Sequence, residues 1–164
     1  MKRILLWLTA LAIPVMLGML PLHGTDAGDL EPAQLLLAEA DGGGLRIVTD
    51  TGAVGTGADP EQALSELTQT AQGSLFLQTA QSVVLTRNAL SFLPQTAQSP
   101  KLRPAAKVYV LDGELPDAAE AAGFLKNHEG GVTLGQVRAA MLGAGRVTLP
   151  VLRNEDGRLM LLAQ

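Results

Sequence analysis

The sequence contains no cysteine at any of its 164 positions. This absence excludes disulfide bonds, metal sites built on thiolates and cysteine nucleophiles, and it equally excludes a lipid anchor attached to an N-terminal cysteine. A domain exported from the cell with this sequence must therefore be stabilised by packing alone.

Aromatic residues are scarce, and positive charge is not in excess. Aromatic side chains make up 3% of the chain although 47% of its residues are hydrophobic, so we expect a core of Leu, Ala and Val. From Gly28 onward, 10 Lys and Arg face 15 Asp and Glu, with both signs interspersed. Nucleic acid calls for a basic stripe, so we expect no nucleic-acid partner.

The sequence also lacks the common catalytic motifs. It has no Gly-x-Ser-x-Gly elbow, no zinc-binding helix motif and no nucleophile placed beside a base in a recognisable pattern. We therefore expect no enzyme activity, no catalytic residue, no cofactor and no metal.

Three features of the sequence are candidates for a binding or catalytic site, and the pattern around each favours a structural role. The glycine-rich stretch from Gly52 to Gly57 precedes a helix, but Asp59 puts a negative charge where a phosphate would bind, so we expect a flexible turn. His128, the one histidine beyond the leader, is flanked by Lys126 and Glu129 and is expected at an exposed helix end. Glu155 and Asp156 lack the alternating oxygen ligands of a calcium loop and are expected in a turn.

The N-terminus carries the one long hydrophobic run. Lys2 and Arg3 precede an apolar stretch that continues through Leu22. About 19 residues at a rise of about 1.5 Å each approach the hydrocarbon thickness of a bilayer. The leading cations favour a cytoplasmic N-terminus, so the chain after His23 is expected to be translocated.

Whether this leader is cleaved stays open at this point. Small residues that favour signal-peptide cleavage are absent around Leu22, and Thr25 to Ala27 offers a weak site. An uncleaved signal anchor is favoured, with a cleaved signal peptide and a buried soluble helix as alternatives. We expect residues 1–27 to form this leader and residues 28–164 to form a single extracytoplasmic domain, held at a bacterial cytoplasmic membrane or, alternatively, secreted.

Local patterns predict the elements of that domain. A hairpin is predicted where a glycine turn separates the segments Gln34 to Glu39 and Leu45 to Thr49. A helix start is predicted at Asp59 with Pro60. An apolar stretch follows at Leu75–Leu77, and further strands are predicted at Ser82–Thr86 and Lys107–Leu111, the latter of them central. Helices are predicted from Pro116 and, through the Thr133–Gln136 capping box, from Thr133.

The C-terminal pattern completes the prediction of the fold. Asp156-Gly157 between two apolar runs predicts a hairpin, and Pro150 predicts an edge or bulged strand. The whole pattern predicts an α+β fold in which about three helices pack on one side of a small, mainly antiparallel or mixed sheet, preceded by an N-terminal hydrophobic helix.

Several of these stretches together resemble the N-terminal domain of the Ger(x)C family, the membrane-anchored C subunits of bacterial spore germinant receptors. The similar stretches are the leader with Asp29-Leu30-Glu31, the hairpin at Leu45–Thr49, Asp59–Leu64, Leu75–Leu77, Val83–Thr86, Lys107–Leu111 and Thr148–Val151. The chain departs from the family in having no cysteine to carry a lipid and in carrying Thr79 where the family has a histidine. Family members also have further domains downstream, whereas this sequence ends after the stretch that resembles the first.

The resemblance implies a non-enzymatic role on the outer face of the membrane, in assembly with multi-pass germinant receptor subunits. The alternative is a secreted or membrane-anchored accessory domain of unrelated function.

Overall fold

The computed structural model describes residues 30–162, apart from residues 72, 129 and 144. The predicted leader, residues 1–27, lies outside the described residues. No helix in the part of the chain that is described is both long enough and apolar enough to cross a bilayer.

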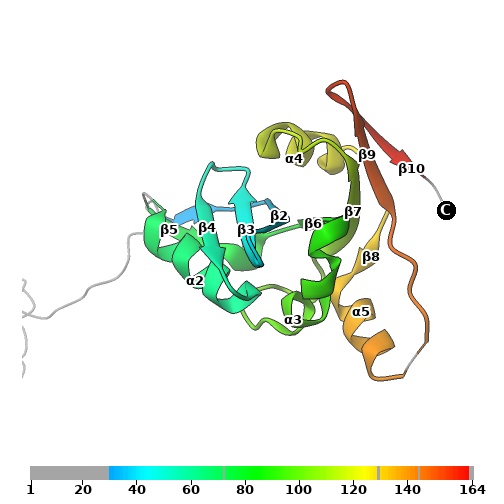
Figure 1. The fold of residues 1–164 in the computed structure, drawn as a ribbon, viewed down its shortest axis with the longest axis horizontal. Coiled ribbons are helices and arrows are strands. Elements are labelled where there is room, and N and C mark those ends of the chain that lie inside the picture. Colours follow the sequence, from blue (N-terminus) through cyan, green and yellow to red (C-terminus); the bar gives the residue numbers. More distant parts are fainter. Residues whose placement is uncertain (1–29, 72, 129, 144, 163–164) are drawn as a thin grey trace, which may run out of the picture.

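Strands and helices alternate along the described chain (Figure 1). The strands are β1 (Leu30–Pro32), β2 (Leu35–Asp41), β3 (Gly44–Thr49), β4 (Val54–Gly57), β5 (Ser74–Phe76), β6 (Ser82–Thr86), β7 (Lys107–Gly113), β8 (Val132–Thr133), β9 (Val151–Glu155) and β10 (Arg158–Leu162). The α-helices are α2 (Pro60–Thr70), α3 (Leu93–Gln98), α4 (Ala118–Lys126) and α5 (Leu134–Met141), and the 3-10 helices are η2 (Leu77–Thr79) and η3 (Arg87–Phe92).

The main sheet is evenly mixed rather than mainly antiparallel. Its strands follow the order β10-β9-β7-β6-β2-β3-β4, with β8 paired to β7, while β1 and β5 form a separate parallel pair. Strands β2, β6, β7 and β9 run parallel, because helix-containing crossovers connect them. The predicted α+β character and the mixed alternative for the sheet are confirmed, with four antiparallel and three parallel strand pairs in the main sheet.

Helices cover both faces of the sheet, not one. One face packs against α2, α3 and α5 through an aliphatic cluster that includes Leu64, Leu67 and Leu134. The opposite face packs against α4, whose Ala121 and Leu125 contact a second cluster. Figure 1 shows α4 on one side of the strands and α2, α3 and α5 on the other. The central parallel strands β2, β6 and β7 are consequently buried on both faces over most of their length.

Local sequence chemistry places several element ends correctly. Asp59 is the N-cap of α2, where its side chain accepts a hydrogen bond from the backbone N–H of Gln62. Thr133 and Gln136 form the predicted capping box at the start of α5. The two predicted hairpins are present as β2–β3 and β9–β10.

Other boundaries differ from the prediction. Pro150 lies just before β9, and β9 pairs with strands on both sides, so it is an internal strand; the edge strand is β10. The proline, which has no N–H to donate, is accommodated because it precedes the strand, and its carbonyl accepts the N–H of Val110 at 3.0 Å. Helix α4 begins at Ala118 with Asp117 as N-cap, two residues after the predicted start at Pro116.

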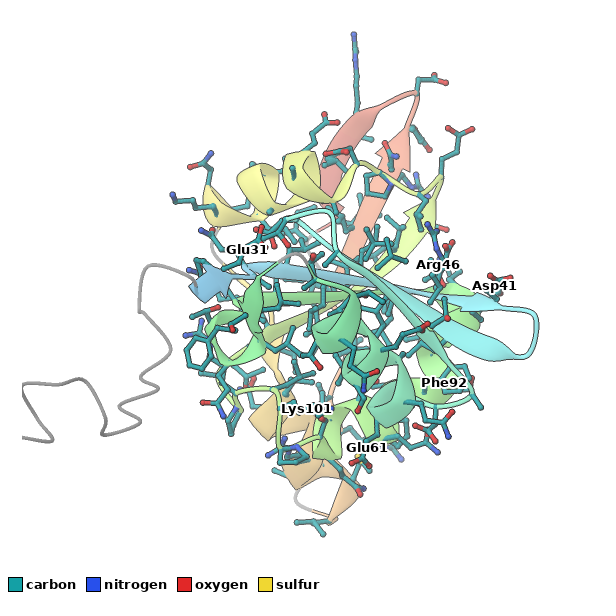
Figure 2. All side chains as sticks on the ribbon, turned by 90° about the vertical axis from the view of Figure 1, so that its left-hand side faces the viewer. Glu31, Asp41, Arg46, Glu61, Phe92 and Lys101 are labelled. Atoms are coloured by element: carbon teal, nitrogen blue, oxygen red, sulfur yellow. The ribbon has the colours of Figure 1, made fainter. Side chains whose placement is uncertain are left out.

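The amino and carboxyl ends of the parallel strands form opposite edges of the molecule. Glu31, just ahead of β2, lies at one end of the sheet, and Asp41, the last residue of β2, lies at the other (Figure 2). Arg46 lies beside Asp41 in the same view, close to the glycine turn. Any site at the strand ends therefore falls on one of these two edges.

Candidate functional site

The main sheet ends in two edge strands, β4 and β10, which differ in whether side chains bond to their outward backbone groups. An edge strand presents unpaired N–H and C=O groups, which can pair with a strand of another protein. The state of these groups on β4 and β10 therefore determines where the sheet can accept a partner.

The outward edge of β4 is closed by side chains of α2. The carboxylate of Glu66 accepts hydrogen bonds from the backbone N–H of Thr56 and, at 2.6 Å, from its hydroxyl. The hydroxyl of Thr70 donates to the carbonyl of Val54 at 2.8 Å. These bonds occupy two outward-facing backbone groups of β4, the N–H of Thr56 and the carbonyl of Val54. They also lower the pKa of Glu66 from its ordinary value, the side-chain bond from Thr56 being the largest cause.

Two glycines allow α2 to approach β4 so closely. A Cβ atom on Gly55 would lie 2.3 Å from the carbonyl oxygen of Ala63, and one on Gly57 would lie 2.5 Å from the amide nitrogen of Ala63. The stretch from Gly52 to Gly57 was expected to be a flexible turn. Instead, its second half is strand β4, where glycine is required for helix packing.

The outward edge of β10 is open. Among the described residues, no hydrogen bond reaches the backbone of β10 from any element except β9. On one face of this strand, Met160 is 42% exposed and Leu162 is 38% exposed, with Arg158 beside them. Leu159 and Leu161 point to the other face and pack on the cluster beneath α4. An open edge with an apolar face is suited to pairing with a protein strand.

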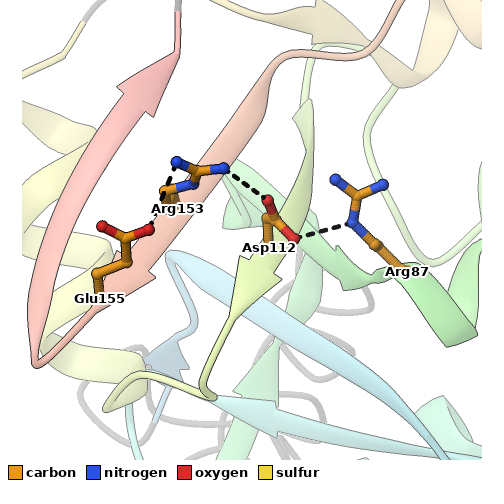
Figure 3. Close-up of polar contacts among 4 residues, drawn as sticks. All are labelled: Arg87, Asp112, Arg153 and Glu155. Atoms are coloured by element: carbon orange, nitrogen blue, oxygen red, sulfur yellow. Dashed lines mark hydrogen bonds and ion pairs between the residues drawn. The ribbon is translucent and has the colours of Figure 1, made fainter.

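A chain of ion pairs fixes the β9–β10 hairpin to the rest of the sheet (Figure 3). Asp112, near the carboxyl end of β7, accepts from Nε of Arg87 at 3.0 Å and from Nη2 of Arg153 at 3.3 Å. Arg153 on β9 also contacts Glu155, with Nη1 and Oε1 3.4 Å apart. Asp112 thus bridges the arginine that follows β6 and the arginine on β9.

These contacts hold Asp112 in its ionised form. The hydrogen bond from Arg87 is the largest cause that lowers the pKa of Asp112, and Arg153 adds to it, while partial burial acts in the opposite direction. The same pair raises the pKa of Arg87. A carboxylate held in this way is a poor proton donor near neutral pH, which favours a structural role.

A second connection lies on the opposite face of the hairpin. Asn154 is buried, and its Nδ2 donates to the carbonyl of Glu114 at 3.0 Å. Gly113 allows the two strands to meet there, because it has a φ of +102° and a Cβ would lie 2.1 Å from the carbonyl oxygen of Asn154. Side-chain contacts therefore fix β9 to the rest of the sheet, while β10 has no strand partner other than β9 among the described residues.

The residues weighed from the sequence do not come together into one site. His128 is exposed beyond the end of α4, stacks on Phe124 with ring centroids 3.9 Å apart, and places Nδ1 2.7 Å from the Phe124 carbonyl oxygen. Glu155 ends β9, and Asp156 occupies the predicted turn with a φ of +51°. Thr79, at the position where the Ger(x)C family has a histidine, donates its hydroxyl to the carbonyl of Ala33 at 2.9 Å.

In the part of the chain that is described, no three His, Cys, Asp or Glu side chains lie close enough to hold a metal ion. The charged side chains around Asp112 neutralise one another in ion pairs. What the β9–β10 hairpin presents to a partner is therefore the exposed surface of β10. Sequence reasoning missed Glu66, Thr70, Arg87, Asp112 and Arg153. Their partners lie 10 to 41 positions away in the chain, so no local motif marks them.

Comparison of the chain with protein-family models, with curated proteins and with solved structures found no match.

Proposed function

We propose that this chain is a non-enzymatic, membrane-anchored extracytoplasmic protein that assembles with integral membrane subunits. The resemblance to the N-terminal domain of Ger(x)C proteins implies that these subunits belong to a spore germinant receptor. The apolar run behind Lys2 and Arg3 supports the anchored topology, since its length and flanking charge suit a signal anchor.

The observation that carries the assembly proposal is the difference between the two edges of the sheet. Glu66 and Thr70 close β4, whereas β10 leaves its outward groups free beside the exposed Met160 and Leu162. Proteins commonly block edge strands that must not pair, so the open β10 is the surface where a partner strand adds. The ion pairs of Asp112 keep this strand in a fixed position for the partner.

The order of elements also supports the alignment with the Ger(x)C domain. The segments that resemble the family around Leu75–Leu77 and Val83–Thr86 fall on β5 with η2 and on β6, directly after helix α2. A helix followed by an aliphatic-aromatic stretch and then a strand is the arrangement that the resemblance implies.

Two measurements on the full chain in its native host test this proposal. Because the chain has no cysteine, Ser91→Cys, on exposed η3, gives a single thiol for labelling with a membrane-impermeant maleimide in intact cells. We expect labelling without lysis, and co-purification of an integral membrane protein with the tagged chain from detergent extracts of sporulating cells. Labelling that requires lysis contradicts the topology. Labelling from outside without a membrane partner favours an accessory domain of unrelated function.

A further inference from the structure

The amino edge of the parallel strands carries a hollow of about 180 Å³ with an unusual charge. Its polar lining consists mainly of Gln34, Gln81, Arg103, Lys107, Lys126 and His128. None of the described residues that line it is acidic, although the chain as a whole has a net charge of −4. Three cationic side chains, Arg103, Lys107 and Lys126, therefore gather where β2, β6 and β7 begin and α4 ends.

The cations of the hollow come from separate parts of the fold. Arg103 precedes β7, Lys107 is its first residue, and Lys126 ends α4. Nε of Arg103 donates to the carbonyl of Ala80 at 2.9 Å, which orients the guanidinium group and leaves its terminal nitrogens available. His128 is held by its stacking on Phe124.

These cations are not neutralised by described carboxylates. The described ion pairs involve Arg46, Arg87 and Arg153, and none includes a residue of the hollow. Asp50 contacts one residue of the hollow, because its Oδ1 accepts the backbone N–H groups of Gln34 and Leu35, but it forms no described ion pair with the cations there. Glu129 follows His128 in the sequence and lies outside the described residues. Lys and Arg groups without a carboxylate partner around a concave surface attract an anion.

The hollow also opens at the edge where the described chain begins. Gln34 in its wall lies four positions after Leu30, the first described residue. Seven residues separate Leu30 from the end of the predicted membrane segment at Leu22, and a fully extended chain of that length spans at most about 25 Å. An anchored domain therefore keeps this edge close to lipid head groups.

We propose that the hollow binds a phosphate group, supplied by an anionic phospholipid of the membrane or by a free phosphate compound. Phosphate suits it because Lys groups act as point charges and the Arg fork can bind two phosphate oxygens. The lipid source rests on the proposed anchored topology, whereas binding of free phosphate does not. Occupancy by lipid sets the orientation of the domain on the membrane, with its strand amino ends toward the bilayer.

The test uses the full chain with a single reporter. Ala105→Cys, exposed at the rim of the hollow, carries an environment-sensitive fluorophore as the chain's one thiol. Two probes are compared: inorganic phosphate added to the protein in non-ionic detergent at constant ionic strength, and nanodiscs of phosphatidylcholine with or without phosphatidylglycerol. A saturable response to phosphate indicates free-phosphate binding, and a response to phosphatidylglycerol alone identifies lipid as the source.

Two double variants with the same change in charge separate a specific site from general attraction. K107Q/K126Q removes two cations from the hollow, and R146Q/R158Q removes two exposed cations outside it. We expect the apparent dissociation constant to rise about tenfold or more in the first variant and to change little in the second. K126Q/H128N, which leaves half-buried Lys107 intact, gives a second measure if K107Q/K126Q folds poorly.

An equal loss in the hollow variants and in R146Q/R158Q, or no response to either probe, overturns the proposal. Its failure is separable from failure of the proposed function, because maleimide labelling of Ser91→Cys reports the topology independently of this hollow.

Discussion

The carboxylate of Glu66 on α2 accepts hydrogen bonds from both the backbone N–H and the hydroxyl of Thr56 on β4. The side chain of a helix residue thus accepts the backbone N–H that a neighbouring strand would otherwise bond. Together with Thr70, it closes one edge of the sheet, while β10 at the other edge stays open. We propose that this asymmetry directs assembly to one side of the molecule.

Replacing Glu66 by Gln should open the β4 edge. The amide cannot accept both bonds with the strength of a carboxylate, so we expect faster hydrogen exchange at the Thr56 amide and a lower urea midpoint. E61Q, on the exposed first turn of the same helix, is the matched control and should leave Thr56 exchange unchanged. Unchanged exchange in E66Q would show that Glu66 does not protect this edge.

The same contact predicts a pH dependence. The pKa of Glu66 is lower in the folded protein than its ordinary value of 4.5, so its stabilising contribution is present above that value. It is lost as the pH falls through the lowered pKa of the folded state. Thr56 amide exchange, corrected for intrinsic rates, should therefore accelerate in acid in the wild type and depend less on pH in E66Q. Parallel pH profiles of the two proteins would contradict this.

Gly55→Ala should destabilise the domain because a Cβ would lie 2.3 Å from the Ala63 carbonyl oxygen and 2.6 Å from the Leu67 amide nitrogen. Overpacking of this kind costs about 1 to 3 kcal/mol of unfolding free energy. Gly123→Ala is the matched control: no atom lies within 4 Å of its added Cβ, and alanine favours the interior of α4. Its unfolding free energy should rise by up to about 1 kcal/mol. Urea unfolding measures both, and equal effects would contradict the packing at Gly55.

Asp112→Asn should loosen the β9–β10 hairpin. The asparagine keeps the shape but loses the charge that holds Arg87 and Arg153, so exchange of the β9 amides should increase. Since the pKa of Asp112 is lowered in the folded state, the stability difference between wild type and D112N should be largest at neutral pH and shrink as the pH falls through that lowered pKa.

E155Q is the control for D112N, because Glu155 is exposed and contacts only the outer side of Arg153. It should have a smaller effect. A urea midpoint of D112N that matches the wild type from neutral pH to acid would exclude a structural role for Asp112.

Sequence patterns predicted those features that depend on neighbouring residues. Each predicted cap or turn involves residues no more than four positions apart in the chain. These are Asp59 with Pro60, Thr133 with Gln136, and Asp156 with Gly157. The α+β class followed from these elements. The leader lies outside the described residues, and it stays a prediction together with the localisation and the partners.

Features set by contacts between distant segments were missed. Whether Ser82–Thr86 pairs parallel or antiparallel with Leu35–Asp41 depends on where the crossover helix packs, which local patterns do not reveal. The position of α4 on the opposite face follows from the same topology. Similarly, Gly55 and Gly57 have the composition of a turn, and only the approach of α2 shows why they are glycine.

Met160→Lys should prevent assembly through β10. A charge on the exposed face of an edge strand opposes burial against a partner, so we expect recovery of a co-purifying membrane protein to fall about tenfold or more. Phe76→Lys, at an equally exposed residue of the separate β1–β5 pair, is the control and should retain the partner. Circular dichroism establishes that both variants are folded. Equal recovery from M160K and wild type would place the partner elsewhere.

Crosslinking in living cells tests the central claim most directly. A photo-crosslinking amino acid replaces Met160 in one strain and Phe76 in another, and the adducts are identified after irradiation during sporulation. We expect an adduct between position 160 and an integral membrane protein, and no adduct at position 76. Adducts of equal yield at both positions, or an adduct only with a cytosolic protein, would contradict it.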